Sequence, residues 1–198
     1  MASIAVNLLT PEAYLAIERK AELKSEYYRG RMYLMAGGTP QHGRIGANTI
    51  TAAVNALRQN RGCEVYTSDV RVLVSPSGLY TYPDVFVVCG DAVYSDEERD
   101  TITNPVVIFE VLSKSTEAYD RGDKFGFYRG IKSLREYVLV SQAKPHIERF
   151  AREVDNGWKL YESSGMDSSL VLESLGCEIA LADIYDKVEF RPEEQARG

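Results

Sequence analysis

The chain has 198 residues, 44% of them hydrophobic and 26% charged, with a formal net charge of −6 at pH 7. This size suits a single domain, residues 1–198, and the acidic charge argues against a protein that coats nucleic acid by bulk charge. No apolar run approaches the roughly 20 residues of a membrane span, and the N-terminal residues lack the pattern of a signal peptide. Isolated cysteines and only two histidines argue against a structural zinc site and favour a reducing, cytoplasmic location.

The first third of the chain predicts two helices with a strand between them. Thr10 and Pro11 are typical of a helix start, and the stretch TPEAYLAIERKAE continues the pattern. Gly30 precedes a predicted strand, RMYLMA. Thr39 and Pro40 repeat the start signal for a helix to about Asn60. One face of that helix is expected to hold Gly46, Ile50, Ala53, Val54 and Leu57.

The rest of the chain is rich in predicted strands. In chain order they are residues 63–74, 84–90, 106–112 and 135–141, with a polar loop at 95–105 and a helix at about 117–131. Residues 146–163 predict a hairpin that turns at Asn156-Gly157. The tail from Leu170 predicts one or two short strands and a charged end that frays. The order favours a mixed α/β domain around a central sheet and disfavours a doubly wound nucleotide fold.

Glu110 is the one charged residue in the apolar run VVIFEVL. Alternation along a strand places Glu110 on one face with Val106, Ile108 and Leu112, and Val107, Phe109 and Val111 on the other. Both faces are apolar, as in a central strand covered on both sides. A buried carboxylate is costly unless it is paired, so Glu110 is either a partner in a salt bridge or hydrogen bond, or a cation ligand.

A second carboxylate, Asp84, follows Pro83 at the start of another apolar strand. Alone, this Pro-Asp pair is most simply turn chemistry. If the two strands are neighbours, however, Asp84 and Glu110 face one point. Hard cations such as Mg²⁺ favour a few carboxylate oxygens with water and phosphate completing the shell.

An ordered set of residues extends this pattern: Pro83-Asp84, Glu110-Val111-Leu112-Ser113, Asp120 to Lys124, Tyr128, Gly130 and Arg135-Glu136-Tyr137. The set resembles the Uma2 (DUF820) family of the PD-(D/E)XK nuclease superfamily. The resemblance implies a restriction endonuclease-like core, a mixed four-stranded sheet flanked by helices, here with an extra C-terminal β-hairpin. It also implies a Mg²⁺- or Mn²⁺-dependent endonuclease, with Asp84 and Glu110 as metal ligands.

The sequence departs from the superfamily motif at Leu112, where a lysine is usual. The resemblance implies that the lysine has moved to the following helix, where Lys124 is the matching catalytic residue. Lys114 is the alternative, because it shares the strand phase of Glu110. Helical spacing places Asp120, Lys124 and Tyr128 on one face, so Asp120 either orients the lysine or forms a simple ion pair with it.

Two further positions match the family. Glu26, just before the first strand, is either a supporting group for the metal or a surface glutamate. His42, in the first turn of the second helix, is expected to be neutral because of the helix dipole, and either contacts a phosphate or water or is a plain surface residue. His146 is expected on a solvated face. Several tyrosines flank these elements and are interpreted mainly as core residues.

The sequence thus predicts an endonuclease that hydrolyses DNA phosphodiester bonds. The alternative is a non-catalytic nucleic-acid- or protein-binding module on the same fold, which the missing lysine at position 112 favours. A serine hydrolase using His42 lacks a recognisable nucleophile motif. We expect DNA as a weak or transient partner, a homo-oligomer that is most simply a dimer, and no membrane association.

Overall fold

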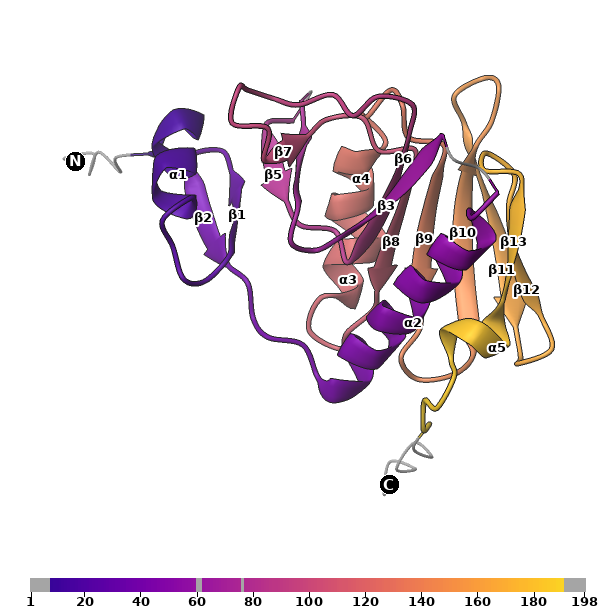
Figure 1. Cartoon of the computed structure of the whole chain (residues 1–198). Helices are drawn as coiled ribbons and strands as arrows, with labels where there is room; N and C mark the ends of the chain where they lie inside the picture. Colours follow the sequence, from indigo (N-terminus) through magenta and orange to yellow (C-terminus); the bar gives the residue numbers. More distant parts are fainter. Residues whose placement is uncertain (1–7, 60–61, 76, 191–198) are drawn as a thin grey trace.

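Most strands of the chain belong to two sheets, as a computed structural model shows for residues 8–59, 62–75 and 77–190 (Figure 1). The larger sheet has the order β11-β10-β9-β8-β6-β3 and the smaller one the order β2-β1-β5-β4-β7. The larger sheet consists of β3 (Cys63–Thr67), β6 (Val85–Cys89), β8 (Val107–Val111), β9 (Glu136–Val140), β10 (His146–Arg152) and β11 (Trp158–Ser164). The smaller sheet consists of β1 (Ser25–Tyr28), β2 (Arg31–Leu34), β4 (Arg71–Val74), β5 (Leu79–Thr81) and β7 (Thr101–Ile102).

The larger sheet is mixed, as predicted. Strands β8 and β9 run parallel, whereas β6 pairs antiparallel with both β3 and β8. The predicted hairpin is β10 and β11, which extend the sheet beyond β9, and Asn156 at its turn has φ 65°. A further hairpin, β12 (Ser169–Leu172) with β13 (Cys177–Ala180), follows.

The smaller sheet is the main feature that the sequence did not predict. Residues 63–74 form two strands, β3 and β4, which lie in different sheets instead of one continuous strand. The predicted loop at 95–105 contains β7, which pairs in parallel with β4. The chain therefore leaves the larger sheet after β3 and returns to it at β6.

The helices are α1 (Pro11–Glu18), α2 (Pro40–Ala56), α3 (Glu117–Tyr119), a π-helix η1 (Asp120–Lys124), α4 (Phe125–Tyr128) and α5 (Leu181–Ile184). Thr10 and Thr39 cap α1 and α2 as predicted, because their hydroxyls accept hydrogen bonds from Ala13 N and His42 N at 3.2 and 3.1 Å. The face expected for α2 is partly wrong. Val54 is 47% exposed, and the buried positions of α2 are Ile45, Thr49, Ala52 and Ala53.

Two apolar layers cover the larger sheet. Helices α2 and α5 pack on the face that carries Val107, Phe109 and Val111 of β8. Helix α4 packs on the opposite face, which carries Ile108 and Leu112. The predicted alternation is thereby confirmed from Val107 to Leu112, and Glu110 belongs to the face beneath η1 and α4. Val106, expected on the Ile108 face, instead packs on the Val107 face, just before β8 begins.

Cys63 and Cys89 are opposite one another on β3 and β6 and form a disulfide. A reducing environment would leave the cysteines as free thiols, so the bond between Cys63 and Cys89 disagrees with that expectation. Among the described residues, Cys177 is the free cysteine. Within the same ranges, no helix is long and apolar enough to cross a membrane. Residues 1–7, most of the stretch considered for a signal peptide, lie outside the described residues. The charged C-terminal residues 191–198 also lie outside them.

Candidate active site

Strand register brings Asp84 and Glu110 together at one end of the larger sheet. Val85 of β6 pairs with Phe109 of β8, so Asp84 lies one residue further along, beside Glu110. The Asp84 Oδ2 atom accepts a hydrogen bond of 2.7 Å from Val111 N, which ties Asp84 to β8. The Glu110 side chain is 5% exposed and the Asp84 side chain 21%. Asp84 is therefore the part of the pair that solvent reaches more easily.

Lys124 extends from η1 onto the same spot. Its Nζ atom is 2.8 Å from Glu110 Oε1, 3.5 Å from Asp120 Oδ1 and 3.7 Å from Glu26 Oε1. One buried ammonium thus contacts three carboxylates. Lys114, the alternative lysine, is exposed in the loop after β8.

Two tyrosines fix the other side of this cluster. The Tyr128 hydroxyl donates a 2.9 Å hydrogen bond to Glu110 Oε1. The Tyr137 hydroxyl donates a 3.0 Å hydrogen bond to the Asp120 carbonyl, and the two rings pack edge to face. Asp120, Lys124 and Tyr128 therefore share one helix face, as predicted, and the tyrosines hold both the strand and the helix backbone.

Glu26 reaches the cluster from the smaller sheet. It lies within β1, not before the first strand as the sequence indicated, and its carboxylate accepts a hydrogen bond from the Thr81 hydroxyl of β5. Its side chain is 15% exposed, so the interpretation as a surface glutamate is wrong. Both sheets consequently contribute acidic groups to one site.

His42 closes the site from the first turn of α2. Its Nε2 atom is 3.3 Å from Asp84 Oδ2. The contact with the Asp84 carboxylate raises the pKa of His42 above its ordinary value, although burial opposes this. This contact acts against the helix dipole, which had suggested a neutral imidazole.

Burial dominates the electrostatics of the acidic groups. It raises the pKa of Glu110 to about 8, against the opposing charge of Lys124, and it also raises the pKa of Asp120. Burial alone would lower the pKa of Lys124, but the neighbouring carboxylates, Glu110 first among them, raise it well above the ordinary lysine value. Ionising these carboxyl groups together would place more negative charge in the site than its own lysine neutralises, and an added cation would relieve that excess.

The oxygen atoms of Asp84 and Glu110 suit a hard divalent cation. Oδ1 of Asp84 and Oε2 of Glu110 have no hydrogen bond with any residue of the ranges 8–59, 62–75 and 77–190, so each is free to bind a cation. Mg²⁺ is usually bound by one or two carboxylates, with water and substrate oxygens as its other ligands. The donor set thus fits the Mg²⁺ or Mn²⁺ expected from the sequence.

Sequence reasoning missed Thr81 and assigned no role to Tyr137. Thr81 meets Glu26 only through the pairing of β1 with β5, which no local pattern announces. Tyr137 lay within the residues that carried the family resemblance, so a signal for it was present. Of the flanking tyrosines, Tyr27 and Tyr80 are buried in a small core with Tyr14, as expected.

Comparisons of the sequence and of the structure with known proteins point to the same family. The model of the Uma2 family, described as "Putative restriction endonuclease", matches residues 11–182. Two proteins of Synechocystis, sll1609 and slr1290, both described as uncharacterized, are 34% and 36% identical and cover 83% and 92% of this chain, which spans 92% and 94% of theirs. A crystal structure described as a putative nuclease belonging to DUF820, from Anabaena variabilis, has a TM-score of 0.70 at 13% identity and covers 88% of this chain and 96% of its own. The chain therefore belongs to the Uma2 family.

Proposed function

We propose that the chain is a metal-dependent endonuclease that hydrolyses DNA phosphodiester bonds. The observation that carries the proposal is the 2.8 Å contact between Lys124 Nζ and Glu110 Oε1, next to Asp84. A lysine from the following helix thus meets the strand carboxylate, although Leu112 stands where the superfamily motif has its lysine. The description of the family as "Putative restriction endonuclease" supports the proposal.

Asp84 and Glu110 would hold Mg²⁺, which supplies a water of lowered pKa and neutralises charge on the scissile phosphate. Glu110 is pre-positioned for this by Tyr128, and Asp84 by the backbone N–H of Val111. These two hydrogen bonds engage Oε1 of Glu110 and Oδ2 of Asp84, so the other oxygen of each carboxylate is available for the cation.

Lys124 acts in this proposal as a fixed positive charge. Because its pKa is raised, it is protonated at neutral pH and is unsuited to accept a proton from water. An ammonium at this place can instead stabilise charge that develops on a phosphate oxygen. Asp120 and Glu26, at 3.5 and 3.7 Å, orient it.

His42 contributes through Asp84. When it carries a proton, an imidazole 3.3 Å from Asp84 Oδ2 favours the ionised carboxylate that a cation requires, and the same contact raises the pKa of His42. The net charge of −6 opposes tight binding to free DNA at physiological salt. We therefore keep weak or transient DNA binding and a homodimer as parts of the proposal, since two linked sites raise the apparent affinity.

A plasmid-nicking assay tests the proposal. Wild type in Mg²⁺ or Mn²⁺ should convert supercoiled DNA to the open circle, and EDTA should stop the reaction. Asp84→Asn and Glu110→Gln, purified identically, should be inactive, which rules out a contaminating nuclease. Lys114→Ala is the matched control for lysine and should retain activity.

A folded wild type that never nicks DNA in either cation would contradict the proposal and favour the non-catalytic module. The same conclusion would follow if Asp84→Asn and Glu110→Gln cleaved like the wild type. Sedimentation velocity of the same samples would check the dimer separately.

A further inference from the structure

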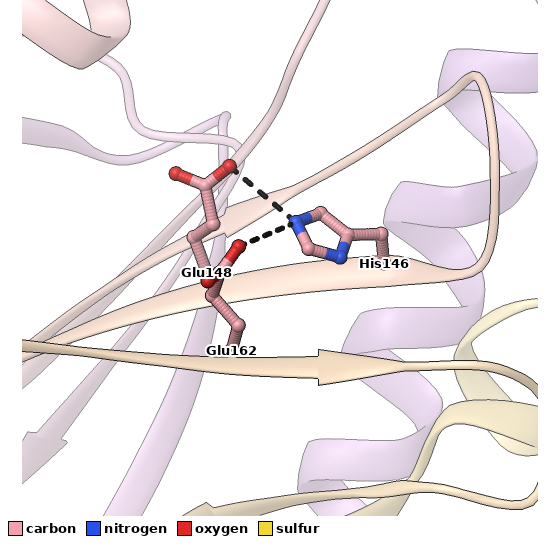
Figure 2. Close-up of side chains that lie close together, drawn as sticks. All are labelled: His146, Glu148 and Glu162. Atoms are coloured by element: carbon pink, nitrogen blue, oxygen red, sulfur yellow. Dashed lines mark ion pairs between the residues drawn. The ribbon is translucent and has the colours of Figure 1, made fainter.

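The hairpin of β10 and β11 gathers three potential metal ligands away from Asp84 and Glu110. His146 and Glu148 are two residues apart on β10 and so share a face, and Glu162 of β11 lies directly opposite Glu148. The His146 Nε2 atom is 3.5 Å from Glu148 Oε1 and 3.4 Å from Glu162 Oε1 (Figure 2). Within the described residues this is the one group of three such side chains whose ligand atoms lie within 4.8 Å of one another.

The imidazole of His146 is held in a defined orientation. Its Nδ1 atom is 2.7 Å from Ser164 Oγ, and Ser164 is the residue opposite His146 on β11. With Nδ1 engaged there, Nε2 is directed toward the two carboxylates. The His146 side chain is only 11% exposed, so the expectation of a solvated histidine is wrong.

Glu148 is supported in the same manner. Its second oxygen, Oε2, accepts a hydrogen bond from Arg121 of η1, which leaves Oε1 facing His146. Metal-binding histidines and carboxylates commonly have such outer partners, which fix the orientation of the ligand atoms. Glu162 has an exposed side chain and can adjust to an incoming ion.

The distances are better matched to a metal than to hydrogen bonds. Both nitrogen–oxygen separations exceed the range of about 2.7–3.2 Å for an N–H···O bond, and a single N–H cannot serve two carboxylates well. Two ligands of a tetrahedral zinc ion, each about 2.0–2.1 Å from it, lie about 3.3–3.4 Å apart. The separations of 3.4 and 3.5 Å at His146 are close to that value.

We propose that His146, Glu148 and Glu162 form a zinc site, with water as the fourth ligand. One imidazole nitrogen and two carboxylate oxygens are ligands that Zn²⁺ accepts, whereas Mg²⁺ prefers oxygen alone. The isolated cysteines had argued against structural zinc, but this set of ligands contains no cysteine.

The zinc site is separate from the candidate active site. Across the sheet, Glu110 pairs with Leu139, and Leu139 pairs with Glu148, so Glu110 and Glu148 are two strands apart. Two strand spacings amount to about 10 Å. Metal ions that act together on one phosphate lie about 3.5–4 Å apart, so this ion is a structural or regulatory one and not a second catalytic metal.

Zinc titration by calorimetry tests the site in the full chain carrying Asp84→Asn, which weakens cation binding at the candidate active site. One Zn²⁺ per chain should still bind. His146→Gln should weaken the affinity by more than about 100-fold, and Ser164→Ala by about 10-fold, because outer partners typically contribute 10–100-fold. Glu162→Gln should also weaken it, whereas Glu153→Gln, a matched control on the same hairpin, should not.

Thermal unfolding of the same proteins gives a second readout. Zn²⁺ at a saturating concentration should raise the melting temperature of the Asp84→Asn chain, and Mg²⁺ at the same concentration should not. The proposal is wrong if this chain shows no Zn²⁺ binding, or if His146→Gln and Glu153→Gln bind Zn²⁺ equally well. Neither outcome depends on whether the protein cleaves DNA.

Discussion

Replacing Glu110 by glutamine removes a titratable carboxyl group from the buried end of β8 and keeps an oxygen acceptor for Tyr128 and Lys124. Burial raises the pKa of Glu110 from 4.5 to about 8. A folded-state pKa above the unfolded one stabilises the fold below about pH 4.5, and this stabilisation is lost as the pH rises through 8. Each pH unit in that window weakens the fold by about 1.4 kcal/mol, so the loss at pH 7 is about 3 kcal/mol.

Glutamine does not titrate, so the variant should avoid this loss. In EDTA, Glu110→Gln should be more stable than the wild type by about 3 kcal/mol at pH 7 and nearly equal to it at pH 5. For a chain of this length that difference corresponds to a rise in melting temperature of about 6–12 °C. Urea unfolding at both pH values, with the exposed Glu178→Gln as the matched control, measures it.

The opposite result would refute the reasoning. If Glu110→Gln is less stable than the wild type by the same amount at pH 5 and pH 7, Glu110 is ionised in the folded protein throughout. Its contact with Lys124 would then be a stabilising ion pair, and the buried charge would carry no net cost.

Three further predictions follow from the same cluster. Lys124→Met, which keeps the aliphatic stem, should lose about 10²–10³-fold in nicking rate, the usual cost of removing one stabilising charge or donor; a loss confined to Lys114→Ala would contradict the assignment. Millimolar Mn²⁺ should raise the melting temperature of the wild type but not of Asp84→Asn, and equal shifts would count against that metal site. Because the pKa of His42 is raised, its stabilisation is present below about pH 6.5 and lost as the pH rises through the higher folded value. Urea unfolding should therefore show His42→Gln less stable than the wild type at pH 6, with the gap closing by pH 9, and a constant gap would show that Asp84 does not hold a protonated imidazole.

The sequence was most informative where local chemistry decides the structure. The caps at Thr10 and Thr39 start helices as predicted, and alternation along β8 assigns Glu110 to the correct face. The choice of Lys124 over Lys114 depended on the family resemblance, and the structure brings Lys124 to Glu110.

Features that depend on long-range pairing were not predictable in this way. The break between β3 and β4 sends one apolar run into two sheets, and only the pairing of β1 with β5 brings Glu26 into the site. Val54 was assigned to the wrong face because the buried stripe of α2 follows Ile45, Thr49 and Ala52–Ala53 and leaves Val54 at its exposed edge. The bond between Cys63 and Cys89 likewise requires the register of β3 on β6.

The π-helical turn at Asp120–Lys124 contains one residue more than an α-helical turn would need, and turns of this kind are often found at functional sites. Deleting Gly122 would leave Asp120 and Lys124 three residues apart, a spacing that in an α-helix still places both on one face. Arg121, next to Asp120, is directed to Glu148 instead, because neighbouring residues of an α-helix are about 100° apart around its axis. One short helix thereby serves both polar clusters of the sheet.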